Sequence, residues 1–301
     1  MPKIITVFGA TGNQGGSVID HIFADDALSD FRIRGITRDP TKPAAQKLAD
    51  RGVELTTADM NSKSSLIKAL SGSHTVFLVT NYWESMNAET EITQGKNVAD
   101  AAKEAGVSHI IFSSLLNVTE VTGGRLKHVP HFDGKAKIEE YIRSTGITCT
   151  FVLPGYFMSN YNQLLRQEED GSYTLAYPVS KTAKFPLFDP ANDTGKFVKP
   201  ALKDPQSFNS RQVLAATDYY TPERILSEFE EVTGKKAKYV QVSAEQFKSF
   251  FPEAMTEEML ENLLFIEEPG YYNGASLQES LSILEDKPTT WKEYIKKSAA
   301  F

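Results

Sequence analysis

Apolar residues in the first half of the chain fall into short continuous runs, separated by stretches in which they recur every three or four positions. Short runs are typical of strands buried on both faces, and the spaced pattern is typical of helices that cover a sheet. The runs predict strands at residues 4–8, 31–37, 53–57, 74–79, 109–113 and 148–153. The spaced stretches predict helices that include residues 18–23, 42–51, 62–70, 89–105 and 131–144. This alternation predicts an α/β fold with a doubly wound parallel sheet.

The first predicted strand leads directly into a glycine-rich turn, in which Gly9, Gly12 and Gly15 have the spacing G-x-x-G-x-x-G. In Rossmann folds these glycines allow a tight turn, a close backbone approach to a pyrophosphate, and close packing of the helix on the strand. The pyrophosphate then lies at the positive end of the helix. Because the motif lies between a strand and a helix, it predicts dinucleotide binding rather than an ordinary glycine-rich turn.

The pattern changes after Pro154, where proline, glycine and aromatic residues become frequent. We expect residues 1–153 to form a dinucleotide-binding Rossmann domain, and residues 154–301 to form a smaller α-rich lobe that binds a substrate or a partner. Parts of 190–235 are expected to return to the first domain. The elements predicted in this half are strands at 211–215 and 239–242, and helices at 244–250 and 256–267 and from about 222 and 289.

Composition narrows the class of function. The chain has 301 residues and a formal net charge of −7, so direct nucleic-acid binding, which usually needs a basic face, is not expected. No stretch reaches the roughly 20 apolar residues of a membrane helix, and the predicted fold begins too early for a signal peptide. Cys149 is the only cysteine and lies in an apolar run, so we expect a core thiol in a reducing compartment. A cytoplasmic protein fits best, while a nuclear location and the oligomeric state stay open.

The end of the second strand indicates which dinucleotide is bound. An acidic residue at this position holds the ribose 2′-hydroxyl of NAD, but here the strand ends with Thr37 and Arg38. The guanidinium group of Arg38 matches a 2′-phosphate, and Lys42 adds a second cation. The residues therefore favour NADP(H) over NAD(H). In the alternative interpretation, Arg38 is a solvated cation and Asp39 contacts the ribose.

Two further segments follow strands at the edge where ligands bind. Asp59 follows the third strand, where it could lie near the adenine or serve as a turn or capping carboxylate. Tyr82 and Trp83 follow the fourth strand, where they could line a ligand pocket or simply cover the edge of the core.

Lys135 is the candidate catalytic residue. It opens the helix after the fifth strand, where it could contact the nicotinamide ribose or act on a substrate proton. The alternative is a surface lysine like Lys137. Tyr141 follows Lys135 by six positions, so the chain lacks the Tyr-x-x-x-Lys order of ordinary short-chain dehydrogenases.

His128 and His131 raise the question of a metal site just before this helix. Pro130 prevents the two rings from sharing one helix face, and no further histidine or cysteine is clustered with them, so we expect no metal. We expect His131 or Asp133 to cap the helix instead.

These motifs together resemble the NmrA-like family, atypical members of the short-chain dehydrogenase/reductases. The resemblance rests on the segments 9–18, 37–40, 80–85, 94–96, 124–126 and 131–135. It implies a Rossmann domain with a small α-rich lobe. It also implies NADP(H) contacts from Gly9, Thr11, Gly12, Asn13, Gln14, Gly15, Arg38, Lys42, Asp59, Met60, Asn81, Tyr82, Trp83, Lys135, Tyr156 and Ser159.

The family includes both enzymes and regulators, and both keep a lysine at the position of Lys135. The first hypothesis is an NADPH-dependent reductase of a small apolar or aromatic carbonyl, enone or imine. Its pocket would be lined by Tyr82, Trp83, Tyr156 and Phe157, with C-terminal aromatic residues as a lid. The second hypothesis is a non-catalytic redox sensor, in which NADP(H) orders the loops around Arg38 and Trp83 and biases a surface for a regulatory protein partner.

Overall fold

The computed structural model describes residues 3–301. Seven parallel strands form the central sheet in the order β11-β6-β5-β4-β1-β2-β3. Their bounds are β1 Lys3–Val7, β2 Phe31–Ile36, β3 Glu54–Thr56, β4 Ser73–Leu78, β5 His109–Ser113, β6 Thr148–Pro154 and β11 Arg211–Ala215. The order reverses between β1 and β4, and ligands of open α/β sheets bind outside the strand ends at such a reversal. The predicted doubly wound Rossmann sheet is confirmed.

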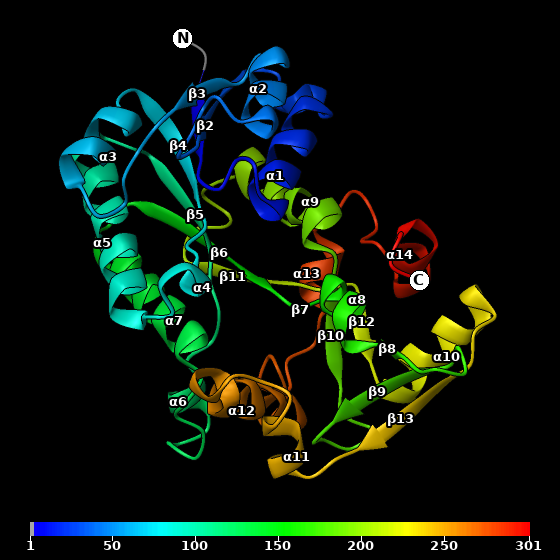
Figure 1. Ribbon diagram of the computed structural model, residues 1–301. Coiled ribbons are helices and arrows are strands. Elements are labelled where there is room, and N and C mark those ends of the chain that lie inside the picture. The colour runs from blue at the N-terminus through cyan, green and yellow to red at the C-terminus, as the bar shows by residue number, and fades with distance from the viewer. Residues whose placement is uncertain (1–2) are drawn as a thin grey trace.

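Helices cover both faces of this sheet (Figure 1). On one face, α5 (Ala88–Glu104) packs between α3 (Lys63–Leu70) and α7 (Pro130–Ser144). On the other face, α1 (Asn13–Phe23) packs along α9 (Pro190–Lys203). A further helix of the first half is α2, Pro43–Asp50.

Alternate residues of each strand supply the two apolar cores between sheet and helices. In β5, Ile110 and Phe112 join the core beneath α5 and α7, while Ile111 joins the core beneath α1 and α9. All three side chains are fully buried. Burial on both faces explains why this strand is a continuous apolar run in the sequence.

The chain returns to the central sheet in its second half. After the lobe begins, α9 packs on α1, and β11 pairs in parallel with β6. Contact between α1 and α9 needs a small residue, because a Cβ on Gly195 would lie 2.5 Å from the backbone oxygen of Ser17. Residues 154–301 therefore contribute both to the Rossmann sheet and to the lobe.

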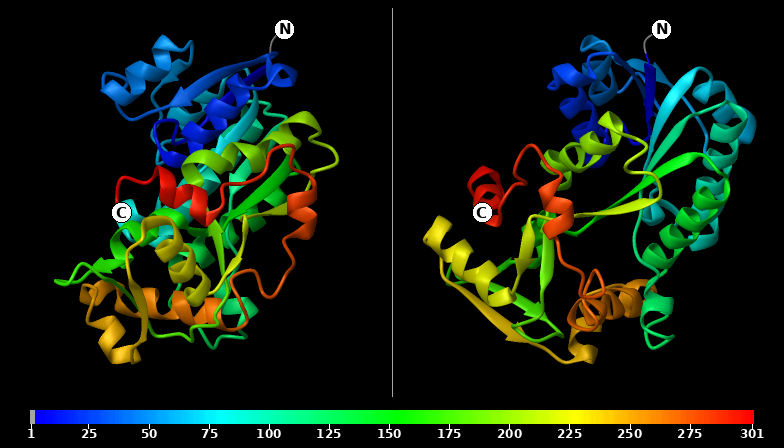
Figure 2. Two further views of the ribbon diagram at one scale, coloured as in Figure 1. Left: turned by 90° about the vertical axis from the view of Figure 1, so that its right-hand side faces the viewer. Right: turned by 180° about the vertical axis from the view of Figure 1, so that it is seen from behind.

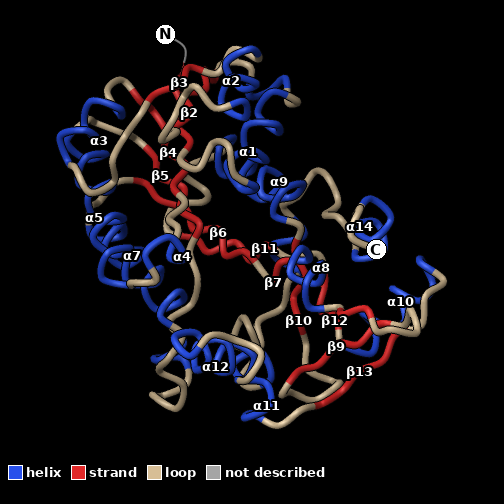
Figure 3. The backbone as a smooth tube through the Cα atoms, viewed as in Figure 1, coloured by secondary structure: helices blue, strands red, loops and turns tan. Residues whose placement is uncertain are grey.

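The lobe holds two small sheets, and only one of their strands, predicted at residues 239–242, was indicated by the sequence patterns (Figures 1 and 3). One has the order β12-β10-β7, with β12 at Asp218–Tyr220, β10 at Phe185–Phe188 and β7 at Tyr156–Phe157. The other has the order β13-β9-β8, with β13 at Ala237–Gln241, β9 at Tyr173–Tyr177 and β8 at Arg166–Gln167. Most of these strands are too short to show a clear two-residue period.

The helices of the lobe lie mainly beside these sheets (Figure 2). The bounds are α8 Tyr161–Leu164, α10 Pro222–Thr233, α11 Ala244–Lys248, α12 Thr256–Glu267, α13 Gln278–Ser282 and α14 Trp291–Lys297. Short 3-10 helices are η1 Asp26–Leu28, η2 Met158–Asn160 and η3 Glu253–Met255. Across residues 3–301, none of the helices has both the length and the apolar character that crossing a bilayer requires.

Two local predictions need correction. The segment after β4 is not a loop but a short helix, α4 (Tyr82–Ser85), which ends at Met86 in a left-handed conformation. Within the described residues, no side chain caps α7, neither that of His131 nor the carboxylate of Asp133. The carboxylate of Asp133 accepts hydrogen bonds from the backbone N–H groups of Val118 and Thr119, at 2.7 and 3.2 Å, and so caps the short helix α6, Val118–Val121. The rigid start of α7 at Pro130 leaves Asp133 inside the first turn, where it faces this neighbour.

Candidate functional site

One cavity of about 1390 Å³ connects the glycine-rich turn with the helices of the lobe. It is larger than the roughly 300–1,000 Å³ of an ordinary small-molecule pocket. Of the sixteen residues that the sequence assigned to the site, Ser159 does not line the cavity, although its neighbour Asn160 does. The other fifteen line it: Gly9, Thr11, Gly12, Asn13, Gln14, Gly15, Arg38, Lys42, Asp59, Met60, Asn81, Tyr82, Trp83, Lys135 and Tyr156.

The glycine loop, residues 9–15, has the geometry that its spacing predicts. Gly9 has a φ of +62°, and the N–H of Gly12 donates to its carbonyl oxygen at 2.8 Å. A Cβ on Gly15 would lie 2.3 Å from that same oxygen, so only glycine allows this packing. Gly12 precedes α1 without a side-chain cap. The first N–H groups of α1 are therefore free of a capping side chain and face the cavity, where an anionic ligand is favoured.

Arg38 lies at the rim of the cavity with 81% of its side chain exposed, and it forms a 2.5 Å ion pair with Glu84 of α4. Asp39 instead accepts hydrogen bonds from the hydroxyl and the N–H of Thr41, which hold the pKa of its carboxyl below the usual value. One carboxylate oxygen of Asp39 is thus already used in a turn. This arrangement favours Arg38 over Asp39 as the residue that contacts the group at the 2′ position of the ribose.

Asp59 and Met60 lie on the neighbouring strand end. The carboxylate of Asp59 accepts two hydrogen bonds from Asn61, at 2.9 and 3.0 Å, so it forms the predicted turn while also lining the cavity. The backbone oxygen of Met60 accepts a hydrogen bond from Asn97 of α5 at 3.0 Å. Asn81 is the N-cap residue of α4, and it also lines the cavity.

Lys135 is not a surface residue like Lys137. Only 9% of it is exposed, and its ammonium group pairs with Glu91 of α5, which is 1% exposed. The same carboxylate oxygen accepts a 2.6 Å hydrogen bond from the hydroxyl of Thr80. Gly134 leaves room for this carboxylate, because a Cβ there would lie 3.2 Å from its second oxygen. The buried carboxylate holds the ammonium group of Lys135 in place at the cavity.

A second cluster joins α4, α7 and α12. The buried carboxylate of Glu258 contacts Nδ1 of His131, and it accepts a 3.0 Å hydrogen bond from the hydroxyl of Tyr82. Burial and the nearby carboxylate raise the pKa of Tyr82 above its ordinary value. Trp83 lies with its ring 5.1 Å from the ring of His131. Tyr82 and Trp83 therefore line the cavity, and Tyr82 also joins the Rossmann half to the lobe.

The lobe end of the cavity, here called the chamber, is lined mainly by aromatic and apolar side chains. They are Tyr156, Tyr177, Phe247, Phe251, Met255, Met259, Leu263 and Tyr271. The hydroxyl groups of Tyr156 and Tyr177 lie 3.1 Å apart, and burial raises the pKa of Tyr156 to about 12. Tyr271 donates a 3.0 Å hydrogen bond to the backbone oxygen of Pro154. These phenols satisfy each other or the backbone, so the chamber presents apolar surface to a ligand.

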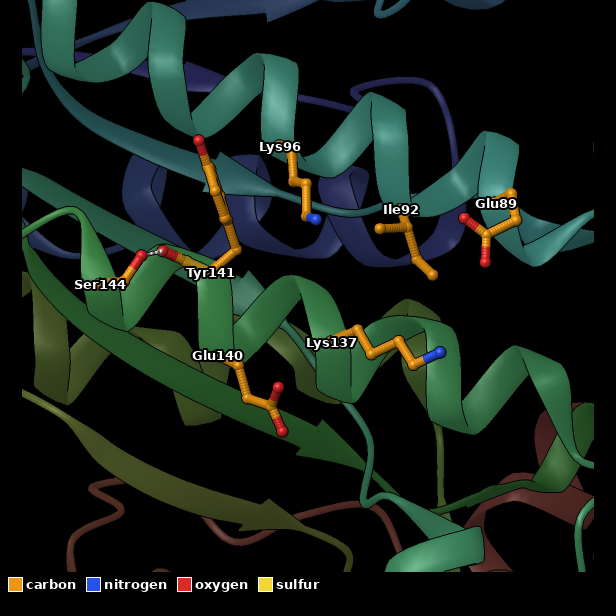
Figure 4. A pocket seen from close by; sticks show the side chains of 7 residues that line it. All are labelled: Glu89, Ile92, Lys96, Lys137, Glu140, Tyr141 and Ser144. Atoms are coloured by element: carbon orange, nitrogen blue, oxygen red, sulfur yellow. Dashed lines mark hydrogen bonds between the residues drawn. The ribbon is translucent and has the colours of Figure 1, made fainter.

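A smaller hollow of about 520 Å³ lies elsewhere, on the outer side of α5 and α7 (Figure 4). Its side chains include Lys96, Lys137, Glu89 and Glu140, so charges of both signs are mixed there. It contains none of the predicted site residues. We therefore place the functional site in the larger cavity.

The sequence did not point to Glu91, Glu258 or the methionines of the chamber as site residues. Glu91 is an acidic residue in the first turn of a helix, a place where glutamate is common for reasons unrelated to function. Glu258 has the same position in α12. Their only distinguishing feature is burial beside Lys135 and His131, which requires the tertiary structure.

Comparison with known proteins agrees with this architecture. The NmrA-like family matches residues 1–295. The curated protein "NmrA-like family domain-containing oxidoreductase malD" of Malbranchea aurantiaca is 36% identical over 80% of this chain and 76% of its own length. The solved structure of NmrA, a negative transcriptional regulator, in complex with NADP has a TM-score of 0.83 at 23% identity, covering 99% of this chain and 95% of its own.

A third similar protein is the triphenylmethane reductase of Citrobacter sp., solved in complex with NADP(H). It has a TM-score of 0.81 at 25% identity and covers 97% of this chain and 99% of its own. The dinucleotide expected from the sequence is the one bound in both of these structures. The family indicated by the motifs of the first half is confirmed by the match over residues 1–295: this chain belongs to the NmrA-like family.

Proposed function

We propose that this chain binds NADP(H) at the glycine loop and reduces a small apolar or aromatic carbonyl, enone or imine in the chamber. The observation that carries the proposal is continuity: one cavity joins the glycine loop, the buried Lys135–Glu91 pair and the aromatic chamber. The description of the relative malD as an oxidoreductase and of the Citrobacter protein as a reductase supports this proposal.

Besides Lys135, the residues fit the dinucleotide at two points. The glycine loop would bind the pyrophosphate. Its tight turn depends on Gly15, where a Cβ would lie 2.3 Å from the carbonyl oxygen of Gly9. Arg38 and Lys42 would hold the 2′-phosphate at the rim, where both line the cavity. When bound, the dihydronicotinamide supplies a hydride, which is the reducing equivalent of the reaction.

Lys135 would bind and orient the nicotinamide ribose. Its ammonium group is anchored by Glu91, so the loss of side-chain freedom on binding is small. Lysine has three donors, and the pair with Glu91 leaves capacity for hydroxyl groups at the cavity surface. A lysine held in this way serves better as a positioning cation than as a mobile proton carrier.

The chamber sets the class of substrate. Its phenols are paired with each other or with the backbone, and most of its remaining lining is phenylalanine, methionine and leucine, beside the side chains of Asn160, Gln163 and Asn262. Such a surface favours flat, uncharged molecules, because a charged group would lose its hydration without a compensating partner. Methionine side chains adapt to irregular ligands, so we expect several related substrates to be accepted.

The first test is titration with NADPH, NADP⁺ and NADH. We expect the Arg38→Glu variant to bind NADPH about 10- to 100-fold more weakly, because a charge-assisted contact to the 2′-phosphate is replaced by repulsion. Its affinity for NADH should stay near that of the wild type, which makes NADH the internal control. An unchanged NADPH affinity would show that Arg38 does not hold the 2′-phosphate.

The second test is NADPH oxidation with a panel of quinones, conjugated ketones and cyclic imines. Lys135→Ala should lower turnover strongly, whereas Lys137→Ala, an exposed lysine on the same helix, should leave it unchanged. NADPH binding without oxidation of any compound in the panel would contradict the reductase proposal.

The sensor hypothesis remains the second candidate because of one specific feature. The ion pair between Arg38 and Glu84 links the 2′-phosphate site to α4, next to Trp83 and Met86, which are 45% and 41% exposed. A ligand that engages Arg38 could move this apolar surface. NmrA, described as a negative transcriptional regulator, provides a precedent. A change in protease cleavage at α4 on adding NADPH, without turnover, would favour this candidate.

A further inference from the structure

Two histidine–glutamate pairs lie one helical turn apart between the start of α7 and α12. Nδ1 of His128 lies 2.6 Å from a carboxylate oxygen of Glu261, and Nδ1 of His131 contacts Glu258. In each pair the backbone N–H of the histidine also points to the same carboxylate, at 2.6 and 3.4 Å. The two pairs therefore have similar local geometry.

Their surroundings differ sharply. The side chain of His128 is 60% exposed, and neither His128 nor Glu261 lines the cavity. The side chain of His131 is 11% exposed, its partner Glu258 is buried, and the ring of His131 lines the cavity beside Trp83 and Phe132. The first pair is an ordinary surface contact, whereas the second carries an imidazole into the functional site.

The contact with Glu258 determines which ring nitrogen faces the ligand. A carboxylate only accepts hydrogen bonds, so Nδ1 of His131 must carry a proton toward Glu258. Within residues 3–301, Nε2 of this ring has no hydrogen-bond partner. It is also not one of the fully buried side-chain atoms that lack such a partner. Because His131 lines the cavity, Nε2 is the ring nitrogen that is left for a ligand there.

The other titratable groups nearby are poorly suited to proton delivery. Lys135, one turn further along α7, is paired with Glu91. The hydroxyl of Tyr82 already donates to Glu258, and burial raises its pKa. Burial also raises the pKa of Tyr156 to about 12, and its hydroxyl contacts that of Tyr177. The titratable groups in contact with His131 are Glu258 and Tyr82, whose ring centre lies 5.9 Å from that of His131.

We infer that His131 is a catalytic residue that delivers a proton from Nε2 to the reduced substrate, and that Glu258 is its positioning residue. This inference rests on the proposed reductase function. In the reduction of a carbonyl, the carbon gains a hydride from the dihydronicotinamide, the C=O π bond breaks, and the oxygen gains the proton that leaves Nε2. For an imine, the nitrogen takes that proton. Solvent then returns a proton to Nε2, so the cycle consumes one proton overall.

The arrangement has a structural consequence for the lobe. Glu258 comes from α12, so the proton-delivering side chain on α7 is held by a residue of the second half of the chain. The carboxylate also anchors Tyr82 of α4. The helix α12 thus lines the chamber and also holds the ring of His131 in place.

The first test reads the tautomer of His131 by ¹⁵N NMR of the histidine side chains, with His131→Asn used to assign its signals. We expect Nδ1–H in the neutral wild-type ring, and Nε2–H, the form preferred by a free histidine side chain, in Glu258→Leu. The matched control Glu261→Leu should change only the signals of His128. Observation of Nε2–H in the wild type, or no change in Glu258→Leu, would overturn the assigned geometry.

The second test is kinetic. His131→Asn retains an amide near the position of Nδ1 but has no atom at Nε2, so kcat should fall by about 10²-fold or more while the affinity for NADPH is unchanged. The control His128→Asn should match the wild type. Glu258→Gln keeps an acceptor oxygen and should restore part of the kcat lost in Glu258→Leu, which a purely structural role for the charge would not do.

The outcomes separate the two proposals. Wild-type oxidation of NADPH with full activity of His131→Asn would overturn the role of His131 and leave the reductase function standing. A wild-type protein that reduces no compound of the panel would overturn both the reductase function and the proton-delivery role.

Discussion

The two ends of the cavity are built from different parts of the chain and from different atoms. The dinucleotide end is centred on backbone, at the glycine loop and the first turn of α1, with the side chains of Arg38 and Lys42 at its rim. The chamber consists of side chains from β7, β9, α11, α12 and the segment before α13. One end depends on the absence of side chains, and the other depends on their size and shape.

This difference separates what is common to the fold from what is particular to this chain. A backbone cradle binds a group present in every dinucleotide, so it needs few specific residues beyond glycine. A chamber of side chains can change its shape with each substitution while the fold is kept. We therefore expect substitutions at the first end to affect cofactor binding, and substitutions at the second to affect substrate choice.

The strongest test of this comparison is Gly15→Ala. The new Cβ would lie 2.3 Å from the carbonyl oxygen of Gly9, so the backbone of the loop must shift. We expect NADPH affinity to fall by about 100-fold or more, corresponding to roughly 3 kcal/mol of overpacking and lost contacts. Isothermal titration measures this change.

Gly16→Ala is the matched control, because its Cβ would lie 3.7 Å from the backbone oxygen of Ala10, an ordinary contact. This variant should bind NADPH like the wild type, and its stability should be unchanged or increased by about 1 kcal/mol, as alanine favours a helix. Equal NADPH affinity of the Gly15 and Gly16 variants would contradict the view that the loop binds through its close packing.

The same difference explains how much could be predicted from the sequence. The Rossmann elements were predictable because strand, turn and helix are contiguous, and the glycines report their backbone geometry locally. The bounds of β5 and α12 agree with the predicted ranges 109–113 and 256–267. Fifteen of the sixteen predicted site residues line one cavity for the same reason.

The chamber could not be predicted in this way. Glu258 contacts His131 across 127 positions of the chain, and Tyr82 across 176. No local period reports such pairs, and acidic residues in a first helical turn are common. Except for the strand predicted at 239–242, the strands of the two small sheets were missed, because most of them have only two to four residues and give little periodic signal.

The next test has an expected effect of intermediate size and concerns the chamber. Phe251 lines it, whereas the adjacent Phe250 lies against the guanidinium group of Arg166, 4.5 Å from the ring centre, outside the cavity. Phe251→Ala should lower kcat/KM for apolar substrates by about tenfold, or about 1.4 kcal/mol, through lost apolar contact. NADPH affinity should stay the same. Phe250→Ala should leave both quantities near wild-type values, and a loss of NADPH affinity in Phe251→Ala would break the division between the two ends.

The smallest expected effect lies at the rim, where Glu84 forms a 2.5 Å ion pair with Arg38. A 2′-phosphate must share or displace this partner, so Glu84→Gln should tighten NADPH binding by at most about fivefold, the range of an exposed ion pair. NADH affinity should not change, and the gain should shrink at high salt.

Glu223→Gln, which breaks the comparably exposed 2.6 Å pair with Lys181 away from the cavity, is the control. Weaker NADPH binding in Glu84→Gln would mean that Glu84 positions Arg38 rather than competes for it, and α4 would then belong to the dinucleotide end of the cavity.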